Sequence, residues 1–426
     1  MSDYANFVKI AMVIFSILIG IEWVASLILK KQIYRLFDTV TSISSGMTNN
    51  LKSILKLSIV IISYQWMYEN WSFKLLDTSW LIFVIAFVGT DFAYYWSHRF
   101  NHRINIMWNR HIIHHSSEEY NLACALRQSI SGITEVYFFL YIPLALIGVP
   151  TTVMSIILPL HLFAQFWYHT RLINNMGILE HILVTPSHHR VHHAINNEYI
   201  DKNYASIFIV WDKIFGTFQK ELKSTPPVYG VKKPVKTWNP ILINFLHVYQ
   251  ILKDAFRTKK WTDKIKIWFM PTGWRPSDLK INYPIETIEN PFTYIKHETK
   301  SGSALKAWSV ILLSLHFLMQ FHLIFLLDKT NFIPLLLYGL FIITSILSAT
   351  SLMDRNKLFL PFEFMKFLFG YFLIIMYPEL LQIFEDFYLS SWVCLLFLFF
   401  SILISIYFSI LDKKEIHTIK FQKTAS

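Results

Sequence analysis

The chain has 426 residues, of which 54% are hydrophobic, and its mean hydropathy is +0.40. This composition is too apolar for an ordinary soluble protein and predicts an integral membrane protein. The net charge is +11, which in a membrane protein is typical of basic cytosolic loops, so no nucleic-acid partner is expected. Cys124 and Cys394 lie far apart in unlike segments, so no disulfide framework is expected either.

About nine apolar runs are long enough for membrane-spanning helices, which need roughly 20 residues each. In chain order they are Phe7–Leu29, Leu55–Trp71, Trp80–Tyr95, Ile130–Gly148, Thr152–Trp167, Leu305–Leu327, Phe332–Leu352, Leu358–Tyr377 and Leu389–Leu411. The predicted fold is therefore an all-α, multi-pass membrane protein.

The same pattern divides the chain into four parts. Residues 1–97 are N-terminal transmembrane helices, and residues 98–304 form a histidine-rich catalytic domain. That domain contains a transmembrane hairpin at 130–168 and a polar cytosolic part at 170–304. Residues 305–412 are C-terminal transmembrane helices, and 413–426 are a cytosolic tail.

The loop charges predict an orientation. Most Lys and Arg residues between the runs fall on one side, including those of His98–Arg127 and Arg171–Lys300. This side is expected to be cytosolic, in either a bacterial inner membrane or the endoplasmic reticulum. The hairpin at 130–168 returns the chain to the side it left, so histidines on both sides of the hairpin are expected at that same membrane face.

Eight histidines form three short patterns. These are His98-Arg-Phe-Asn-His102, His111-Ile-Ile-His114-His115 and His189-Arg-Val-His192-His193. Residues three and four apart share a helix face. By analogy with known two-metal sites, such faces can converge on two metal ions about 3–6 Å apart. Imidazole ligands suit Zn, Cu, Fe and Ni.

A metal or proton transporter is the main alternative to an enzyme. A transporter would place its ligands near the bilayer midplane. The patterns lie instead at or beyond helix ends, beside Arg99, Arg110 and Arg190. This position favours a catalytic site at the membrane face, open to both water and lipid.

The three patterns resemble the fatty acid hydroxylase and sterol desaturase superfamily of integral membrane di-iron oxygenases. The wider text around them, including Thr185-Pro-Ser-His-His, Asp201-Lys-Asn-Tyr-Ala205 and Trp211-Asp-Lys-Ile-Phe-Gly-Thr-Phe218, is similar to the alkylglycerol monooxygenase branch. The strong similarity covers roughly residues 90–220. One position departs from it, since this branch carries Glu where the chain has Arg103.

The resemblance implies two Fe ions, O₂ as oxidant and hydroxylation of a C–H bond in a lipid drawn from the bilayer. In the alkylglycerol branch the hydroxylated carbon is ether-linked, the products are a fatty aldehyde and glycerol, and the reductant is tetrahydrobiopterin. Sterol and fatty acyl hydroxylases or desaturases of the superfamily use protein electron donors instead, and this alternative stays open.

The resemblance also assigns roles to residues. The catalytic and metal-ligating set is His98, His102, His111, His114, His115, His189, His192 and His193, with His169 as a further metal ligand. Candidates for supporting these ligands are Asp91, Glu118, Asn121, Gln165, His188 and Asp212. For His161, core packing and metal ligation both remain open.

Overall fold

The structure is a computed structural model that describes the backbone of residues 2–381 and 391–424. Those residues are mostly helical. The first half contains α1 (Ser2–Ile28), α2 (Leu36–Ile54), β1 (Ile59–Val60), α3 (Tyr64–Trp71), α4 (Trp80–Arg103), α5 (Asn105–Trp108), α6 (Ile112–His115), η1 (Leu122–Leu126), β2 (Thr134–Glu135), η2 (Val136–Tyr141), α7 (Ile142–Leu146), α8 (Thr151–Phe163), η3 (Gly177–His181) and α9 (Pro186–His192). The second half contains α10 (Val210–Ile214), α11 (Pro240–Arg257), α12 (Trp261–Phe269), α13 (Ser277–Asn282), η4 (Pro291–Thr293), α14 (Ser303–Leu326), α15 (Phe332–Met353), α16 (Phe359–Met376), η5 (Pro378–Leu381) and α18 (Ser391–Thr424).

Six helices are long and apolar enough to cross a membrane, among the residues that the structure describes. These candidate spans are Phe7–Ile28, Trp80–Arg103, Ser303–Leu326, Phe332–Met353, Phe359–Met376 and Ser391–Phe408. They indicate a multi-pass membrane protein and correspond to six of the nine predicted spans. The predicted start of the last span, at 389–390, lies outside the described residues.

The other three predicted spans do not form single long helices. The run Leu55–Trp71 is broken after Leu55, where Lys56 adopts φ 52°, and only its end is helical as α3. The run Ile130–Gly148 folds into β2, η2 and the short α7. The helix of Thr152–Trp167 ends at Phe163. Pro143 lies in the first turn of α7 and contributes to the break before it, because proline removes a backbone donor and disfavours a continuous helix, whereas α8 runs through Pro159.

The short helices still form a hairpin that turns back at Gly148. This glycine adopts φ +85°, and a Cβ there would lie 1.7 Å from the Lys74 carbonyl oxygen, so the turn requires glycine. α8 returns along α4, packing Val153 and Ile157 against a shared core with Ala86. The chain thereby comes back to the end of α4 that carries the first histidine pattern.

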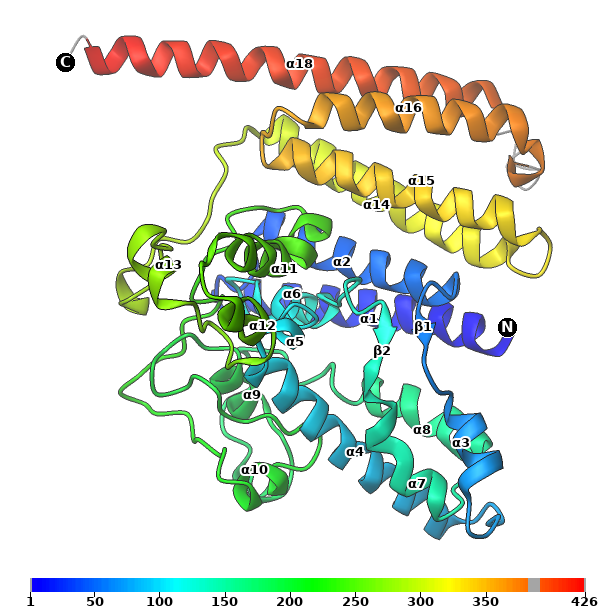
Figure 1. Cartoon of the computed structure of the whole chain (residues 1–426). Helices are drawn as coiled ribbons and strands as arrows, with labels where there is room; N and C mark the ends of the chain where they lie inside the picture. The colour runs from blue at the N-terminus through cyan, green and yellow to red at the C-terminus, as the bar shows by residue number, and fades with distance from the viewer. Residues whose placement is uncertain (1, 382–390, 425–426) are drawn as a thin grey trace.

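The long C-terminal helices stack as successive antiparallel layers, α14 and α15 next to α2 and then α16 and α18 outermost (Figure 1). Their shared core includes Leu323, Ile342 and Ile346, with Leu51 of α2 packed against it. α2 was not among the predicted elements because it is rich in Ser and Thr. Its buried polar face, which includes Asp38 and Ser42, faces the histidine patterns and becomes part of the site.

The polar stretch between α8 and α14 folds around the C-terminal part of α4 (Figure 1). Asp91 of α4 fixes it there. Its carboxylate accepts hydrogen bonds from the backbone N–H groups of Ile207 and Phe208 at 2.9 and 3.0 Å and from the Trp211 indole at 2.9 Å. A buried carboxylate with three donors is well satisfied, so this contact attaches the loop before α10 firmly to a spanning helix.

Candidate metal centre

Nine buried or half-buried histidines converge on one region from four segments of the chain. They form two groups, and within each group one ring nitrogen from every histidine lies within 4.8 Å of the others. The first group is His98, His102, His111, His115 and His192, and the second is His114, His169, His189 and His193. All nine histidines that the sequence proposed as metal ligands therefore meet, and each group mixes residues from different patterns.

Backbone carbonyls fix the orientation of four of these rings. The Nδ1 atoms of His98, His192 and His169 lie 2.7, 2.9 and 3.0 Å from the carbonyl oxygens of Tyr204, Lys202 and Gln165, in that order. The Nδ1 of His114 lies 3.2 Å from the Arg127 carbonyl oxygen. A carbonyl only accepts, so each Nδ1 carries the proton and each Nε2 presents its lone pair to the centre of its group. This is the tautomer that a metal ligand needs.

The Nε2 atoms at the centre of each histidine group have too few hydrogen-bond donors around them. His189 Nε2 lies 3.0 Å from Nε2 of both His169 and His193, although three neutral imidazoles facing one another cannot all be satisfied by one shared proton. Among the described residues, the buried Nε2 atoms of His102, His115 and His192 have no hydrogen-bond partner. Buried polar atoms are normally paired, so inward-facing lone pairs fit a site for cations.

The protonation states agree with this interpretation. Burial lowers the pKa of His169 to about 3. Burial, with smaller contributions from neighbouring imidazoles, lowers the pKa well below its ordinary value for His111, His114, His115, His189, His192 and His193. These rings are neutral near pH 7 and available as ligands. The donor set is nearly all imidazole, which suits Fe or Zn better than Mg or Ca.

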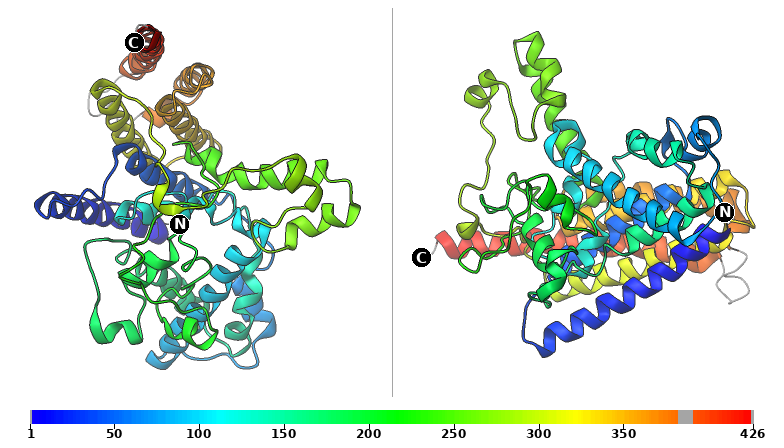
Figure 2. Two further views of the ribbon diagram at one scale, coloured as in Figure 1. Left: turned by 90° about the vertical axis from the view of Figure 1, so that its left-hand side faces the viewer. Right: turned by 90° about the horizontal axis from the view of Figure 1, so that it is seen from below.

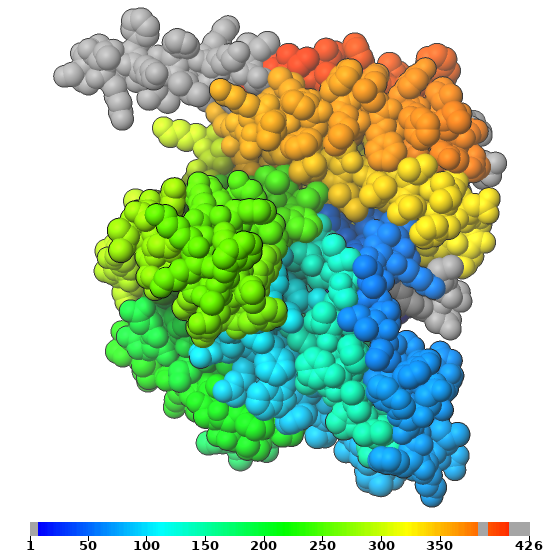
Figure 3. Space-filling model, viewed as in Figure 1, coloured from blue at the N-terminus to red at the C-terminus, as the bar shows by residue number. Residues whose placement is uncertain are grey.

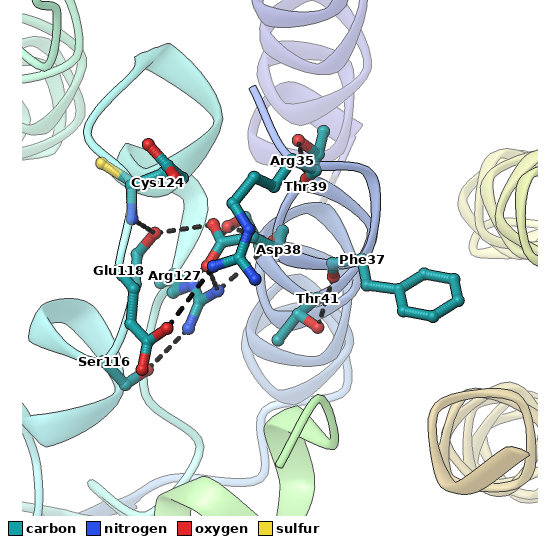
Figure 4. A network of polar contacts seen from close by, with 12 residues as sticks. Arg35, Phe37, Asp38, Thr39, Thr41, Ser116, Glu118, Cys124 and Arg127 are labelled. Atoms are coloured by element: carbon teal, nitrogen blue, oxygen red, sulfur yellow. Dashed lines mark hydrogen bonds and ion pairs between the residues drawn. The ribbon is translucent and has the colours of Figure 1, made fainter. Parts of the chain in front are cut away.

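A buried ion pair lies directly behind the second histidine pattern (Figure 4). The Arg127 guanidinium donates to Asp38 Oδ2 at 2.8 Å and to the hydroxyls of Ser116 and Ser42 at 2.8 and 3.0 Å. Ser117 donates to the other oxygen of Asp38 at 2.6 Å. Since the Arg127 carbonyl also accepts from His114, this network holds the second pattern against α2.

Asp212 supports the first group through the backbone. Its carboxylate accepts from the N–H groups of Tyr204 and Ala205, both at 2.8 Å, and from the Thr217 hydroxyl at 2.6 Å. Burial raises the pKa of Asp212, partly opposed by these hydrogen bonds. Because the Tyr204 carbonyl in turn receives the His98 Nδ1–H, Asp212 sets the position of a ring nitrogen that it does not touch.

Replacing Asp212 with Ala is expected to lower metal affinity by about 10–100-fold, the range usual for residues that orient ligands. The Tyr204–Ala205 backbone would lose its acceptor and the His98 ring its fixed tautomer. Competition of the purified protein with a graded series of chelators measures the affinity. Asp201→Asn, in the same loop but paired with Arg103 at the surface, is the matched control and should bind metal normally. Equal affinity in both variants would contradict this role for Asp212.

Asp91, His161 and Gln165 form a separate buried chain beside the second group. His161 Nε2 lies 2.8 Å from Asp91 Oδ1, and the Gln165 amide donates to His161 Nδ1 at 3.1 Å. His161 is fully buried and lies in neither histidine group, so the structure places it in the core. Asp91 pairs with His161 and with backbone donors, and Arg127 pairs with Asp38. Gln165 contacts the site through its carbonyl, which orients His169.

Three other proposed supporting residues lie behind the site. Glu118 accepts from the Tyr294 hydroxyl and the His297 N–H, and Asn121 donates to the Ile33 carbonyl. His188 packs on Phe218. Among the hydrogen bonds of the described residues, none joins these three side chains to a clustered histidine. Arg103 pairs with Asp201 at 2.7 Å on the surface.

Two buried acidic residues near the site, Glu22 and Asp38, were not among the candidates selected from the sequence. Glu22 lies inside the first apolar run and accepts hydrogen bonds from Tyr34, Thr170 and the Leu122 N–H, so it ties α1 to the segment that follows His169. An ionisable residue within a span is itself a signal of a specific role. Asp38 is less easily recognised, because its apolar surroundings come from helices distant in sequence.

A cavity of about 300 Å³ opens onto both histidine groups. His98 and His111 of the first group and His114, His169 and His189 of the second line one end. Val8, Met12 and Phe15 of the spanning helix α1 line another part of its wall, together with Phe166. The site therefore combines neutral imidazoles with an apolar passage beside a membrane-spanning helix, which is the environment needed to oxidise a lipid.

Two groups of histidines that could each hold a metal ion, beside a cavity lined by apolar side chains of a spanning helix, define a membrane oxidoreductase that acts on lipids. Residues 83–217 match the fatty acid hydroxylase family, and the chain belongs to this family. Within it, the chain is alkylglycerol monooxygenase-like. It is 40% identical to alkylglycerol monooxygenase of Homo sapiens over 367 residues, which is 84% of this chain and 80% of that protein.

Two further relatives show the breadth of the similarity. Alkylglycerol monooxygenase of Xenopus tropicalis is 36% identical over 322 residues, covering 74% of this chain and 70% of that protein. The ornithine lipid hydroxylase OlsE of Rhizobium tropici is 27% identical over 148 residues, covering 35% of this chain and 45% of that protein. No solved structure matches the chain.

Proposed function

We propose that this protein is a di-iron monooxygenase that hydroxylates the ether-linked carbon of alkylglycerols and releases a fatty aldehyde and glycerol. The observation that carries the proposal is the cavity in which two imidazole groups meet the apolar wall of α1. The similarity to alkylglycerol monooxygenases over most of the chain supports the substrate. The lipid enters from the bilayer, and tetrahydrobiopterin is the proposed reductant.

The reaction balances with these components. Two iron ions held by the nine histidines would supply the activation of O₂. One oxygen atom enters the C–H bond next to the ether oxygen, and the other leaves as water with two electrons and two protons from the tetrahydropterin. The resulting hemiacetal breaks its C–O bond to glycerol and becomes an aldehyde. The chain itself orients the imidazoles and excludes bulk water, and its apolar cavity positions the alkyl chain.

We also propose the placement of this chemistry in the cell. The site lies at the cytosolic membrane face, with residues 98–304 as the catalytic domain between the helices of 1–97 and 305–412. The basic residues that gather between the spans on that side support this orientation. A reductant dissolved in the cytosol would then reach the site without crossing the bilayer.

The test is an assay of iron-loaded protein in detergent with an alkylglycerol, with and without reduced tetrahydropterin. Oxygen consumption and fatty aldehyde are measured together, and His192→Ala serves as the blank. The proposal expects aldehyde that depends on pterin and disappears in the variant. Absence of aldehyde from protein shown to hold two irons would refute the ether substrate and its reductant.

A second candidate is hydroxylation of a fatty acyl or sterol carbon with a protein electron donor. The similarity to an ornithine lipid hydroxylase over 148 residues favours it, as does Arg103 in place of the Glu of the alkylglycerol branch. Incubation with acyl lipids and a ferredoxin or cytochrome system, followed by mass spectrometry, separates the two. A product heavier by one oxygen with no aldehyde would establish the acyl reaction, and a product lighter by two hydrogens would establish desaturation.

The cavity wall predicts control of chain length. Ala11 of α1 lines the cavity, so Ala11→Trp would fill space that the alkyl chain occupies. The variant is expected to retain its metal and to prefer shorter alkyl chains, with KM rising most for the longest substrates. Val13→Trp is the matched control, because Val13 is exposed on the same helix and does not line the cavity. A parallel loss for all chain lengths would argue against this path for the lipid.

A further inference from the structure

A continuous row of exposed apolar side chains follows α11 and α12. On α11 the spacing is three and four residues, which places these side chains on one helix face. The row, called here the apolar stripe, consists of Leu242, Phe245, Tyr249, Leu252 and Phe256 on α11 and Trp261, Ile265 and Phe269 on α12. Phe256 is 82% exposed and Trp261 78%. A face of this size normally has an occupant.

Hydrogen bonds to the ends of two spanning helices fix the position of the apolar stripe along the membrane normal. At the start of α11, the Trp238 N–H donates to Asp354 just beyond α15, and Asn239 donates to Ser351 of α15 at 3.0 Å. At the end of α12, the Met270 carbonyl accepts from the N–H of Asn105, two residues after α4. α11 and α12 are therefore held at the level where α4 and α15 leave the membrane.

The helix pair extends sideways from that level. Figure 2 shows α11 to α13 projecting across the direction in which the spans run, in both views. In Figure 3 the same segment, in yellow-green, lies at the surface below the orange spanning helices. A segment that leaves the bundle at a membrane face and runs across the span direction lies along the membrane surface.

The charges around the stripe complement an anionic surface. Residues 240–283 contain eight Lys and Arg residues against three Asp, and one of those aspartates, Asp254, is already paired with Arg275 at 2.6 Å. Lys259 and Lys260 are exposed in the turn between the helices, and Lys266 is exposed on α12. Trp and Tyr next to basic residues are characteristic of side chains that sit among lipid headgroups.

We propose that α11 and α12 form an interfacial anchor, whose apolar stripe lies in the headgroup region and whose basic residues bind anionic phospholipids. The anchor is independent of the reaction proposed above. It holds the catalytic domain against the bilayer on the side where α4 ends, and α4 carries His98 and His102. The membrane surface is thereby kept at the height of the two histidine groups.

Site-directed spin labelling tests the anchor in the full-length protein reconstituted into vesicles. Phe256→Cys and Ile265→Cys carry the label on the stripe, and Lys220→Cys on an exposed polar loop is the control. Cys394→Ala removes one native thiol, and Cys124 remains because it is buried and burial raises the pKa of its thiol to about 12. Collision rates with O₂, which enters lipid, and with a nickel chelate, which stays in water, are compared.

In vesicles of phosphatidylcholine with phosphatidylglycerol, the stripe labels are expected to collide several-fold more with O₂, relative to the nickel chelate, than the Lys220 label. Stripe labels as accessible to nickel as the control would overturn the proposal. Protection from both reagents, with spin–spin broadening between labels, would show a second copy of the chain on the stripe and would also overturn it.

A charge variant tests the recognition of anionic lipid. Lys259→Gln combined with Lys260→Gln and Lys266→Gln should reduce the difference in label depth between vesicles with and without phosphatidylglycerol. The matched control carries Lys220→Gln and Lys223→Gln, in an exposed polar segment. If the stripe labels lie equally deep in both vesicles for the unaltered protein, lipid charge has no part in the anchor and that half of the proposal is wrong.

Discussion

His193→Ala is expected to reduce the bound metal from two ions per chain toward one and to abolish turnover. His193 belongs to the group of four imidazoles, so its removal leaves three. Its Nε2 lies 3.0 Å from that of His189, at the centre of the group. Loss of a direct ligand should cost more than the about 10–100-fold in affinity that outer residues cost. Elemental analysis after dialysis against a weak chelator measures the stoichiometry.

His115→Ala is the informative comparison. It belongs to the group of five, so four imidazoles remain after its removal, which is a complete set for one ion. This variant should retain more metal than His193→Ala under the same dialysis, although the position of the ion and the rate would change. Equal metal loss in both variants would show that the two groups are one cooperative site, and no metal loss in either would remove the basis for a two-metal centre.

The convergence of the histidines could be predicted from the sequence, because it depends on local rules. Spacings of three and four residues place imidazoles on one helix face, and the hairpin formed by α7 and α8 returns the chain to the end of α4 that carries His98 and His102. Which histidines belong to which of the two groups could not be predicted. His111 joins His98 while His114, three residues later, faces His169, and that depends on the exact rotation of α6 against three other segments.

The three predicted spans that do not form long helices have a similar explanation. Hydropathy alone identifies helices that are long and uniformly apolar, such as α14 and α15. Ile130–Gly148 is as apolar as a span on average, but Ser and Gly near its start and Pro143 within it favour β2, η2 and a short helix. Conversely, α2 was missed because its Ser and Thr residues are buried by segments distant in sequence, such as Arg127 against Ser42 and Trp238 against Thr41, which only the tertiary structure shows.

The supporting acids could be recognised as candidates but not assigned partners. Asp212 and Asp91 both act on backbone N–H groups of residues 204–208, and such contacts leave no pattern in side-chain spacing. Glu118 looked equally suitable because it follows the second pattern directly. It turns away to Tyr294 and the His297 backbone, near the segment that leads into α14.

Asp38→Asn is expected to destabilise the protein by about 3–5 kcal/mol, the usual cost of removing one partner from a buried ion pair. Asp38 and Arg127 have side chains only 3% and 2% exposed, and their closest atoms are 2.8 Å apart. The substitution would leave the Arg127 guanidinium charged and buried, with a neutral amide and two hydroxyls facing it in place of a carboxylate. Thermal unfolding of the purified protein in detergent, followed by its Tm, measures the loss.

The exposed pair of Arg103 and Asp201 provides the control. With side chains 51% and 32% exposed, it should contribute only about 0–1 kcal/mol, so Arg103→Gln should barely change the Tm. A Tm for Asp38→Asn as high as that of Arg103→Gln would mean that the Arg127 charge is hydrated or paired elsewhere.

Removing both charges of the buried pair separates stability from function. Asp38→Leu with Arg127→Met leaves no unpaired charge and should recover part of the lost Tm, because well-packed apolar residues often replace buried ion pairs without loss. Metal affinity should be lower than in the unaltered protein, since the Arg127 carbonyl that orients His114 would no longer be held by the contacts to Ser42 and Ser116. Recovery of stability without recovery of metal binding would identify the ion pair as a positioning element of the metal centre rather than a stabilising one.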